Sequence, residues 1–355
     1  MKRCIVILSW MLVFALSAFP RDKTDLLIMK NGDHMTGEIK GLDSGVLYVS
    51  LDYVDGTTSV DWSKVARVES RQLFLVKTQD GSVYIGTIRT PETASEEPIK
   101  IEVLQTGEQP SSVFEQSKVV QMIATSDKFL ERFNGEVSLG VIYSKGNQST
   151  QYSLGSETVY VRERWNAQAA FASNLSSSAG ANVSTRNSLS FGARHLLPWN
   201  KWFYSGLGTF LQSSEQGIAL QSTLGGGLGR YLKDTNRTTI TLLGGMAWQN
   251  THYNSTSAGS TVPTSENVAA GLLYAEARLF KFSKTNLDLS AALLPAMSDP
   301  GRVWFNTNAS YYIKIISNLK WNVSFYGNWD SRPPHRFSGS DYGTSSGLSW
   351  TFGLK

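Results

Sequence analysis

The sequence predicts an all-β protein, in which an antiparallel transmembrane β-barrel of about twelve strands follows small β units of SH3 or Sm type. Three observations lead to this prediction. Segments of alternating polarity fill residues 133–355, turn-forming pairs punctuate residues 24–126, and an apolar leader occupies residues 1–19. The chain is therefore expected to consist of an exported N-terminal β region and a larger membrane domain.

The leader has the layout of a secretory signal peptide. Lys2 and Arg3 form its charged start, 5–16 is its apolar run, and Ser17 and Ala18 provide small residues for cleavage. An N-terminal membrane anchor is the alternative, but the apolar run is shorter than the ~20 residues that a spanning helix needs. The only cysteine, Cys4, precedes the apolar run, so the mature chain is expected to have no thiol chemistry.

Composition excludes few classes of protein. The chain is 41% hydrophobic and 17% charged, with a net charge of +4 and no block of Lys and Arg, so nucleic-acid binding is not expected. No stretch after the leader approaches the ~18 consecutive apolar residues of a membrane helix. A closed barrel is the other structure that pairs all of its backbone groups inside a membrane.

Residues 24–126 are predicted to form two related β units, 24–70 and 71–126. Turn-forming pairs such as Asn31-Gly32 and Asp80-Gly81 separate short apolar segments. Ser63-Lys64-Val65 at the end of the first unit recurs as Ser117-Lys118-Val119 at the end of the second. This self-similarity indicates an internal duplication with a spacing of about fifty residues.

Residues 133–355 contain twelve segments of alternating polarity. A count of ten or fourteen stays open, because boundaries read from one sequence err by ~2–4 residues. A soluble β-sandwich is the alternative, although strands with so few charges on either face would dissolve poorly. The segments are approximately 133–144, 149–162, 165–176, 181–196, 201–213, 219–232, 238–251, 265–281, 285–297, 302–315, 319–330 and 341–354.

The last segment shows the alternation most clearly. Bulky residues such as Leu348, Trp350 and Phe352 alternate there with glycine and hydroxyl residues. Successive side chains of a strand point to opposite faces, so one face is apolar and the other is small and polar. We interpret this segment as the closing strand of the barrel, with Trp350 and Phe352 as the candidate signal for insertion by the barrel-assembly machinery.

The lengths of the connections predict the orientation. If both ends of the barrel domain lie in the periplasm of a Gram-negative cell, the long connections 253–264 and 331–340 face outward and the short connection 317–318 faces the periplasm. The N-terminal units are then periplasmic and the barrel lies in the outer membrane. Eight tryptophans are expected near strand ends, as two interfacial girdles. They are Trp165, Trp199, Trp202, Trp321 and Trp350 at the periplasmic edge, and Trp248, Trp304 and Trp329 at the outer edge.

Several stretches resemble a bacterial family of salt-induced outer-membrane proteins, whose defining domain is domain of unknown function 481. They are residues 135–140, 145–147, 201–204 and 223–229 with 234–235 in the barrel region, and 30–33, 36–37 and 60–62 in the N-terminal region. The resemblance covers nearly all of the mature chain and implies an outer-membrane barrel, but no known activity. One departure is the end of the chain, where Phe352 is followed by three further residues.

No pattern in the sequence indicates enzymatic chemistry, a metal or another cofactor. The glycine-rich stretch 224–231 lacks the strand–loop–helix context of a phosphate site, and we interpret it as a strand with a small lumenal face. The four histidines have no metal-ligand spacing. An outer-membrane hydrolase that uses His252 and Ser255 is the least favoured alternative.

Four charged residues have the strand parity of the lumen: Glu136, Arg194, Lys314 and Asp330. They predict either an internal charge network that fills the barrel or the lining of a pore, because charges at membrane depth must pair or meet water. Two roles follow. The protein is a passive channel for small solutes, or a structural anchor whose N-terminal units bind a periplasmic partner. Outer-membrane lipid is an expected partner in both.

Overall fold

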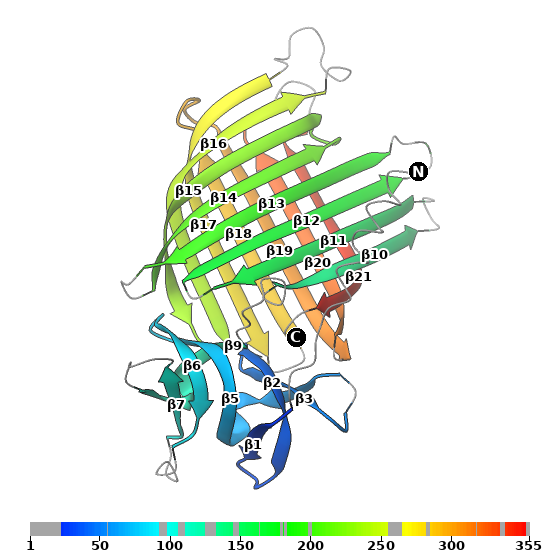
Figure 1. Ribbon diagram of the computed structural model, residues 1–355. Coiled ribbons are helices and arrows are strands. Elements are labelled where there is room, and N and C mark those ends of the chain that lie inside the picture. Colours follow the sequence, from blue (N-terminus) through cyan, green and yellow to red (C-terminus); the bar gives the residue numbers. More distant parts are fainter. Residues whose placement is uncertain are drawn as a thin grey trace.

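The computed structural model is a closed β-barrel with a smaller β domain packed against one of its two ends (Figure 1). We call this end of the barrel the domain-side end and the opposite one the distal end. The predicted leader, 1–19, lies outside the described residues. The structure describes residues 23–54, 56–91, 98–105, 111–124, 133–144, 149–162, 164–177, 180, 183–197, 201–254, 265–281, 285–316, 318–333 and 338–352.

The predicted barrel of twelve antiparallel strands is confirmed. Each strand pairs with the next along the chain, and the predicted segments agree with the observed strands to within a few residues. The strands are β10 (Phe133–Ser144), β11 (Ser149–Val161), β12 (Trp165–Ser177), β13 (Ser184–Leu196), β14 (Trp202–Ser213), β15 (Ile218–Asp234), β16 (Thr238–Tyr253), β17 (Ser265–Lys281), β18 (Thr285–Pro295), β19 (Val303–Ile316), β20 (Leu319–Asp330) and β21 (Ser340–Phe352).

The first and last strands close the barrel. β10 pairs with β21 in a register that places Val137 opposite Trp350 and Leu139 opposite Leu348. These four side chains lie on the outer face, so the apolar alternation of the closing strand continues across the seam. Closure leaves no free strand edge in the barrel, and this is what a sheet in a membrane requires.

The outer surface of the barrel is a belt of exposed apolar side chains. Leu139, Met246 and Leu273 are each more than half exposed although they lie in mid-strand. An exposed apolar belt of this size is unfavourable in water and favourable against lipid. The apolar face of the alternating strands therefore points outward, as in membrane barrels. In a soluble β protein the apolar face would point into the core.

Six of the predicted girdle tryptophans lie on this outer face, near the strand ends: Trp165, Trp202, Trp248, Trp321, Trp329 and Trp350. Trp199 lies outside the described residues. The prediction was wrong for Trp304, which points into the lumen and is 6% exposed. It shares the strand face of Asn306, and the guanidinium of Arg302 lies 4.5 Å from its ring centroid. The ring of Trp304 therefore packs against an arginine inside the barrel and does not lie at the membrane interface.

The glycine-rich strand β15 gives the lumen room for large apolar side chains. A Cβ atom on Gly229 would overlap the ring of Phe203, which is fully buried. A Cβ atom on Gly225 would lie 3.4 Å from Leu272, a lumenal side chain of β17. The glycines are thus needed for packing, and this supports the interpretation of the stretch as a strand with a small lumenal face.

The smaller domain is a nine-stranded sheet with one hydrophobic core. The core joins Leu27, Ile39 and Val68 from the first predicted unit with Phe74 and Ile88 from the second. The strands are β1 (Asp25–Met29), β2 (His34–Asp43), β3 (Val46–Leu51), β4 (Thr58–Asp61), β5 (Val65–Thr78), β6 (Val83–Arg89), β7 (Lys100–Gln105), β8 (Ser112–Glu115) and β9 (Val119–Ala124), with short 3-10 helices at Trp62–Lys64 and Gln116–Lys118.

The pairing of these strands repeats, as expected for a duplication. β1 pairs with β2 and with the first half of β5, while the second half of β5 pairs with β6 and β9. The two 3-10 helices occupy equivalent places and bind each other. Trp62 Nε1 donates to the carbonyl of Gln116 at 3.0 Å, and Gln116 Nε2 donates to the carbonyl of Trp62 at 2.6 Å. The two units share β5 and this reciprocal contact, so they form one body.

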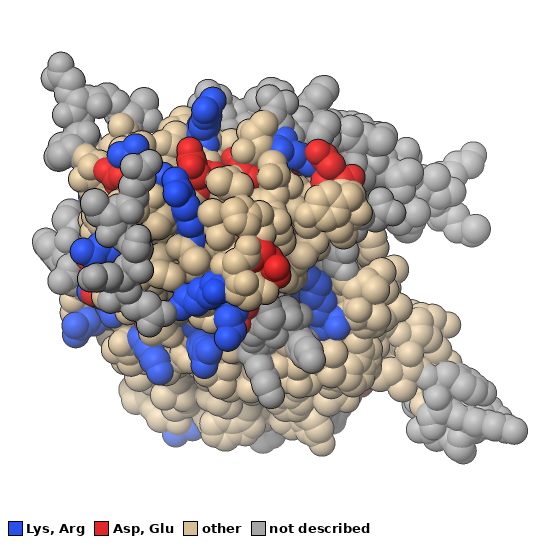
Figure 2. Space-filling model, turned by 90° about the horizontal axis from the view of Figure 1, so that it is seen from below, with Lys and Arg blue, Asp and Glu red and all other residues tan. Residues whose placement is uncertain are grey.

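Among the described residues, no helix is long and apolar enough to cross a membrane. Figure 2 shows the molecule from the domain-side end, where Lys and Arg side chains lie in both the upper and the lower part of the view and Asp and Glu lie mainly in its upper part.

We predict that Gly229→Val destabilises the barrel. The new side chain must displace the buried ring of Phe203, and overpacking of this kind costs about 1–3 kcal/mol. The measurement is the temperature at which the detergent-solubilised barrel loses its folded electrophoretic mobility, and this temperature should fall. Gly206→Val on β14 is the control, because a Cβ atom there meets nothing within 4 Å. Equal transition temperatures for the two variants would contradict the packing role of the glycine strand.

Candidate functional site

Near the distal end of the lumen, side chains from strands that are not neighbours contact each other. The strands β13 and β21 are not neighbours, since β10, β11 and β12 separate them around the barrel. Nevertheless, Arg186 of β13 donates from Nη1 to Oδ2 of Asp341 of β21 at 2.9 Å. Ser213 of β14 donates to the same oxygen at 2.7 Å, and the Arg186 guanidinium lies 4.5 Å from the ring centroid of Tyr326. These contacts tie β13 and β14 to β21 across the lumen.

A second charge cluster lies at the distal end, on the turn between β18 and β19. Arg302 donates from Nε and Nη2 to the two carboxylate oxygens of Asp330 at 3.0 and 2.7 Å, and from Nη1 to Glu266. The side chain of Arg302 is only 5% exposed, so its charge depends on these partners. The bidentate geometry is the strongest form of such a pair.

A third cluster lies in the half of the lumen nearer the domain-side end. Arg194 of β13 donates to Oε2 of Glu276 of β17 at 2.6 Å, and Arg278 approaches the other carboxylate oxygen at 2.7 Å. β14, β15 and β16 separate the strands of Arg194 and Glu276, so this pair also spans the interior. Charges that point away from lipid are thus neutralised inside the barrel, as burial requires.

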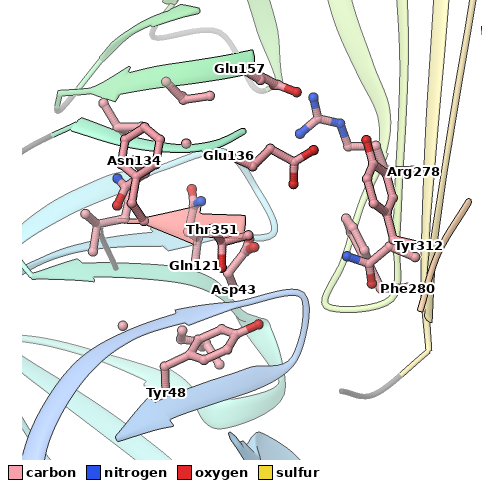
Figure 3. Close-up of a pocket in the computed structure, with 18 of the residues that line it drawn as sticks. Asp43, Tyr48, Gln121, Asn134, Glu136, Glu157, Arg278, Phe280, Tyr312 and Thr351 are labelled. Atoms are coloured by element: carbon pink, nitrogen blue, oxygen red, sulfur yellow. The ribbon is translucent and has the colours of Figure 1, made fainter. Parts of the chain in front are cut away.

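A cavity of about 210 Å³ with both polar and apolar lining residues lies at the domain-side mouth, between the barrel and the smaller domain. Figure 3 shows Glu136 and Glu157 from one wall pointing toward Arg278 of the opposite wall. Lys320 approaches Glu136 at 3.6 Å. The smaller domain closes the cavity from below with residues that include Asp43 and Tyr48.

The smaller domain is held on the mouth by a buried lysine. Lys77 of β5 reaches Oδ2 of Asp234 at the end of β15 at 2.6 Å, and its ammonium lies 4.4 Å from the ring centroid of Tyr231. The two side chains of the ion pair are 13% and 4% exposed. Burial alone would lower the pKa of Lys77, but Tyr231 and Asp234 raise it above its usual value of 10.5. Lys77 is therefore charged at neutral pH.

Three further contacts join the domain to the barrel. Lys314 of β19 donates to the Ser59 hydroxyl at 2.8 Å. The tight turns of the two units abut turns of the barrel: a Cβ atom on Gly45 would lie 3.2 Å from the carbonyl oxygen of Asn236, and one on Gly81 would lie 3.3 Å from the backbone nitrogen of Lys201. Both glycines have positive φ angles, so glycine suits the turn and the close approach alike.

The four predicted lumenal charges have different surroundings. Glu136 lies in the mouth cavity, Arg194 pairs with Glu276, and Asp330 pairs with Arg302. Lys314 faces the same mouth but binds the smaller domain. The structure therefore brings Glu136 and Lys314 to one end of the barrel, whereas Asp330 lies at the other.

Sequence reasoning missed most of the partners of these charges. Glu276 and Arg278 share the inward parity of β17 and could have been found from alternation. Arg302 lies in a turn and Lys77 in another domain, so no strand pattern identifies either of them. Asp341 is the first lumenal residue of the closing strand, and its partner Arg186 is distant in sequence.

The alternative enzymatic site is not assembled by the described residues. His252 lies exposed on the outer face of β16, and Ser255 lies outside the described residues. Within the described ranges, no three metal-ligating side chains of His, Cys, Asp or Glu gather in one place.

A family model described as "Protein of unknown function, DUF481" matches residues 137–352, which is more than half of the chain. The chain belongs to this family. The match starts and ends within the barrel, between β10 and the end of β21, so the smaller domain lies outside it. The resemblance that the sequence showed is confirmed for the barrel region. No curated protein matches the chain.

Solved structures with a similar fold are outer-membrane barrels. The translocator domain of the autotransporter NalP from Neisseria meningitidis is 14% identical, with 62% of this chain and 87% of that chain covered and a TM-score of 0.35. An outer membrane channel from Pseudomonas putida F1 is 10% identical, with 62% and 94% covered and a TM-score of 0.36. The NanC porin is 10% identical, with 61% and 99% covered and a TM-score of 0.38. At such identities the likeness concerns the fold alone.

We predict that Lys77→Met releases the smaller domain from the barrel. The variant leaves Asp234 buried without its cation, and breaking a buried pair in this way costs about 3–5 kcal/mol. Hydrogen exchange of the amides in the β15–β16 turn, residues 235–238, should become faster. The matched control is Lys118→Met, an exposed lysine of the same domain.

The same ion pair gives the docking a dependence on pH. Because the pKa of Lys77 is raised above 10.5 in the docked state, its contribution is complete below 10.5 and is lost as the pH rises through the raised value. Slow exchange of the turn at neutral pH in the Lys77→Met variant would contradict the role of Lys77.

Proposed function

We propose that the protein is an outer-membrane barrel with a closed lumen, which anchors its duplicated N-terminal domain at the periplasmic surface of that membrane. The observation that carries this proposal is the set of contacts across the lumen at Asp341. Arg186 and Ser213 reach this carboxylate from β13 and β14, which are not neighbours of β21, and its side chain is 5% exposed. A barrel with bonds of this kind through its interior is better suited to hold a domain in place than to conduct.

The location in the membrane rests on the outer belt. Exposed apolar side chains surround the barrel, and six tryptophans lie near the two ends of its strands. This is the distribution that lipid on the outside and two interfaces would stabilise.

The orientation rests on the connections between strands. At the domain-side end they are short, such as 235–237 and 317–318, whereas 254–264 and 331–339 join strands at the distal end. Short turns are typical of the periplasmic side of such barrels. The N-terminal domain would then lie in the periplasm, where it can bind a partner.

A passive channel for small solutes is the second candidate, because part of the lumen is polar and open. Thr209 and Asn308 have lumenal parity and are exposed, and the mouth cavity of about 210 Å³ has charged residues such as Glu136 and Arg278 in its lining. In this candidate the N-terminal domain is a cover that must leave the mouth before solutes pass. We propose no enzymatic role, since His252 lies on the outer face without an orienting partner among the described residues.

Conductance in planar bilayers separates the two candidates. The full mature chain is extracted from the outer-membrane fraction, shown to be heat-modifiable and inserted into a bilayer. The wild type should give no sustained conductance steps, because ion pairs cross its lumen and the domain covers its mouth. Steady steps from the wild type would contradict the closed lumen.

The Lys77→Met variant is measured beside it, with Lys118→Met as control. If none of the three proteins gives conductance steps, the result supports the anchoring role. Steps from Lys77→Met alone would instead show a channel that the N-terminal domain covers.

Recovery of the wild type in the soluble periplasmic fraction without detergent would refute the membrane location itself.

A further inference from the structure

An arc of basic side chains follows the domain-side rim of the barrel from β11 to β16. Three consecutive connections at this end contribute to it, together with the last residues of β15. We call it the basic rim, and it consists of Arg162, Arg164, Lys201, Arg230, Lys233 and Arg237. Lys201 is half-buried and the other five are exposed.

The basic rim has no acidic counterpart in the described part of the chain. None of its six residues forms an ion pair with a described carboxylate, whereas other described arginines do, such as Arg186 with Asp341 and Arg302 with Asp330. Asp234, the acidic residue nearest to Lys233 in sequence, is 4% exposed and already bound to Lys77. Asp234 is therefore not available to neutralise Lys233, and among the described residues no other carboxylate pairs with the rim.

The rim is held in place by the backbone. The amide of Leu196 donates to the carbonyl of Arg164 at 2.8 Å, and the amide of Tyr231 donates to the carbonyl of Lys201 at 2.8 Å. These bonds tie the connections to the ends of the neighbouring strands. The basic side chains thus project from fixed points, and binding to them would cost little ordering of the backbone.

The basic side chains lie next to the apolar belt. Arg230 faces outward on β15, where its neighbours in register are Trp202 on β14 and Leu242 on β16. The guanidinium of Arg230 lies 5.5 Å from the Trp202 ring centroid. Leu232, between Arg230 and Lys233, is 56% exposed. A cation beside an indole ring at the end of an apolar strip is the arrangement that the headgroup region of a bilayer favours.

We infer that the basic rim is a binding site for anionic phospholipids, whose phosphates contact Arg230 and Lys233 while their acyl chains cover the belt at Leu232 and Leu242. The inference rests on the proposed membrane location and adds the class of lipid that the domain-side leaflet supplies. A soluble anion would pair with the basic side chains but would leave the adjacent leucines exposed to water. An anionic lipid contacts both, and the cluster of positive charge favours an anionic headgroup over a zwitterionic one.

The test compares two lipids on the full mature chain in non-ionic detergent. Dioleoylphosphatidylglycerol and dioleoylphosphatidylcholine are added at equal concentration, and bound lipid is counted by native mass spectrometry. The wild type should retain phosphatidylglycerol preferentially. The double variant Arg230→Gln/Lys233→Gln should lose this preference by a factor on the order of ten, given the usual contribution of each basic residue near an anionic surface.

Two controls make the result specific. Lys64→Gln/Lys118→Gln removes the same charge from exposed positions of the N-terminal domain and should keep the wild-type preference. Excess inorganic phosphate should fail to displace the bound lipid. An unchanged preference in the rim variant, equal retention of both lipids by the wild type, or complete displacement by inorganic phosphate would each overturn the assignment.

Failure of this inference is distinguishable from failure of the proposed function. The lipid comparison is made only on protein that comes from the membrane fraction and is heat-modifiable. A chain recovered without detergent would contradict the membrane location, whereas a membrane barrel without lipid preference would contradict the basic rim alone.

Discussion

The structure depends on the closure of β10 on β21. Inside a membrane every backbone donor and acceptor must find a partner within the protein, so the sheet has to end where it begins. Closure also fixes which way each side chain points, since the register that places Val137 opposite Trp350 on the lipid side turns Glu136 and Thr351 inward. The polar residues of the strands are thereby collected in a narrow lumen, where their charges must pair with one another.

The charges in the lumen pair through contacts between strands and turns on different sides of the barrel. Arg186 with Asp341, Arg194 with Glu276 and Arg302 with Asp330 each neutralise a buried charge, and the first two bridge strands that are not neighbours. Lys77 extends the same principle to the smaller domain, because it neutralises Asp234 at the last position of β15. Docking of the domain is thus part of the electrostatic balance of the barrel. Turns of both predicted units meet the barrel, at Gly45 and at Gly81.

Alternation of polarity was sufficient to predict the strands of the barrel and the inward direction of Glu136, Arg194 and Asp330, because a strand has only two faces. It could not predict their partners, since pairing across a lumen depends on the curvature of the closed sheet and not on distance in the sequence. Trp304 is a residue whose side of the strand was predicted incorrectly. Proximity to a strand end suggested an interface, but the parity of β19 and the guanidinium of Arg302 place it inside. The repeated turns and the Ser-Lys-Val sequences predict a duplication, but they could not predict the contact between Trp62 and Gln116, because this contact depends on the fold.

The central claim is that the N-terminal domain is docked on the mouth of the barrel as one body with it. The most direct measurement is the distance between two spin labels, one at Lys64→Cys in the domain and one at Leu232→Cys on the exposed face of β15, with the full mature chain in nanodiscs. The only native cysteine, Cys4, lies in the predicted leader and would not interfere. Docking predicts one narrow distribution of distances at neutral pH. A broad distribution, as for a domain that is tethered but free to move, would contradict it.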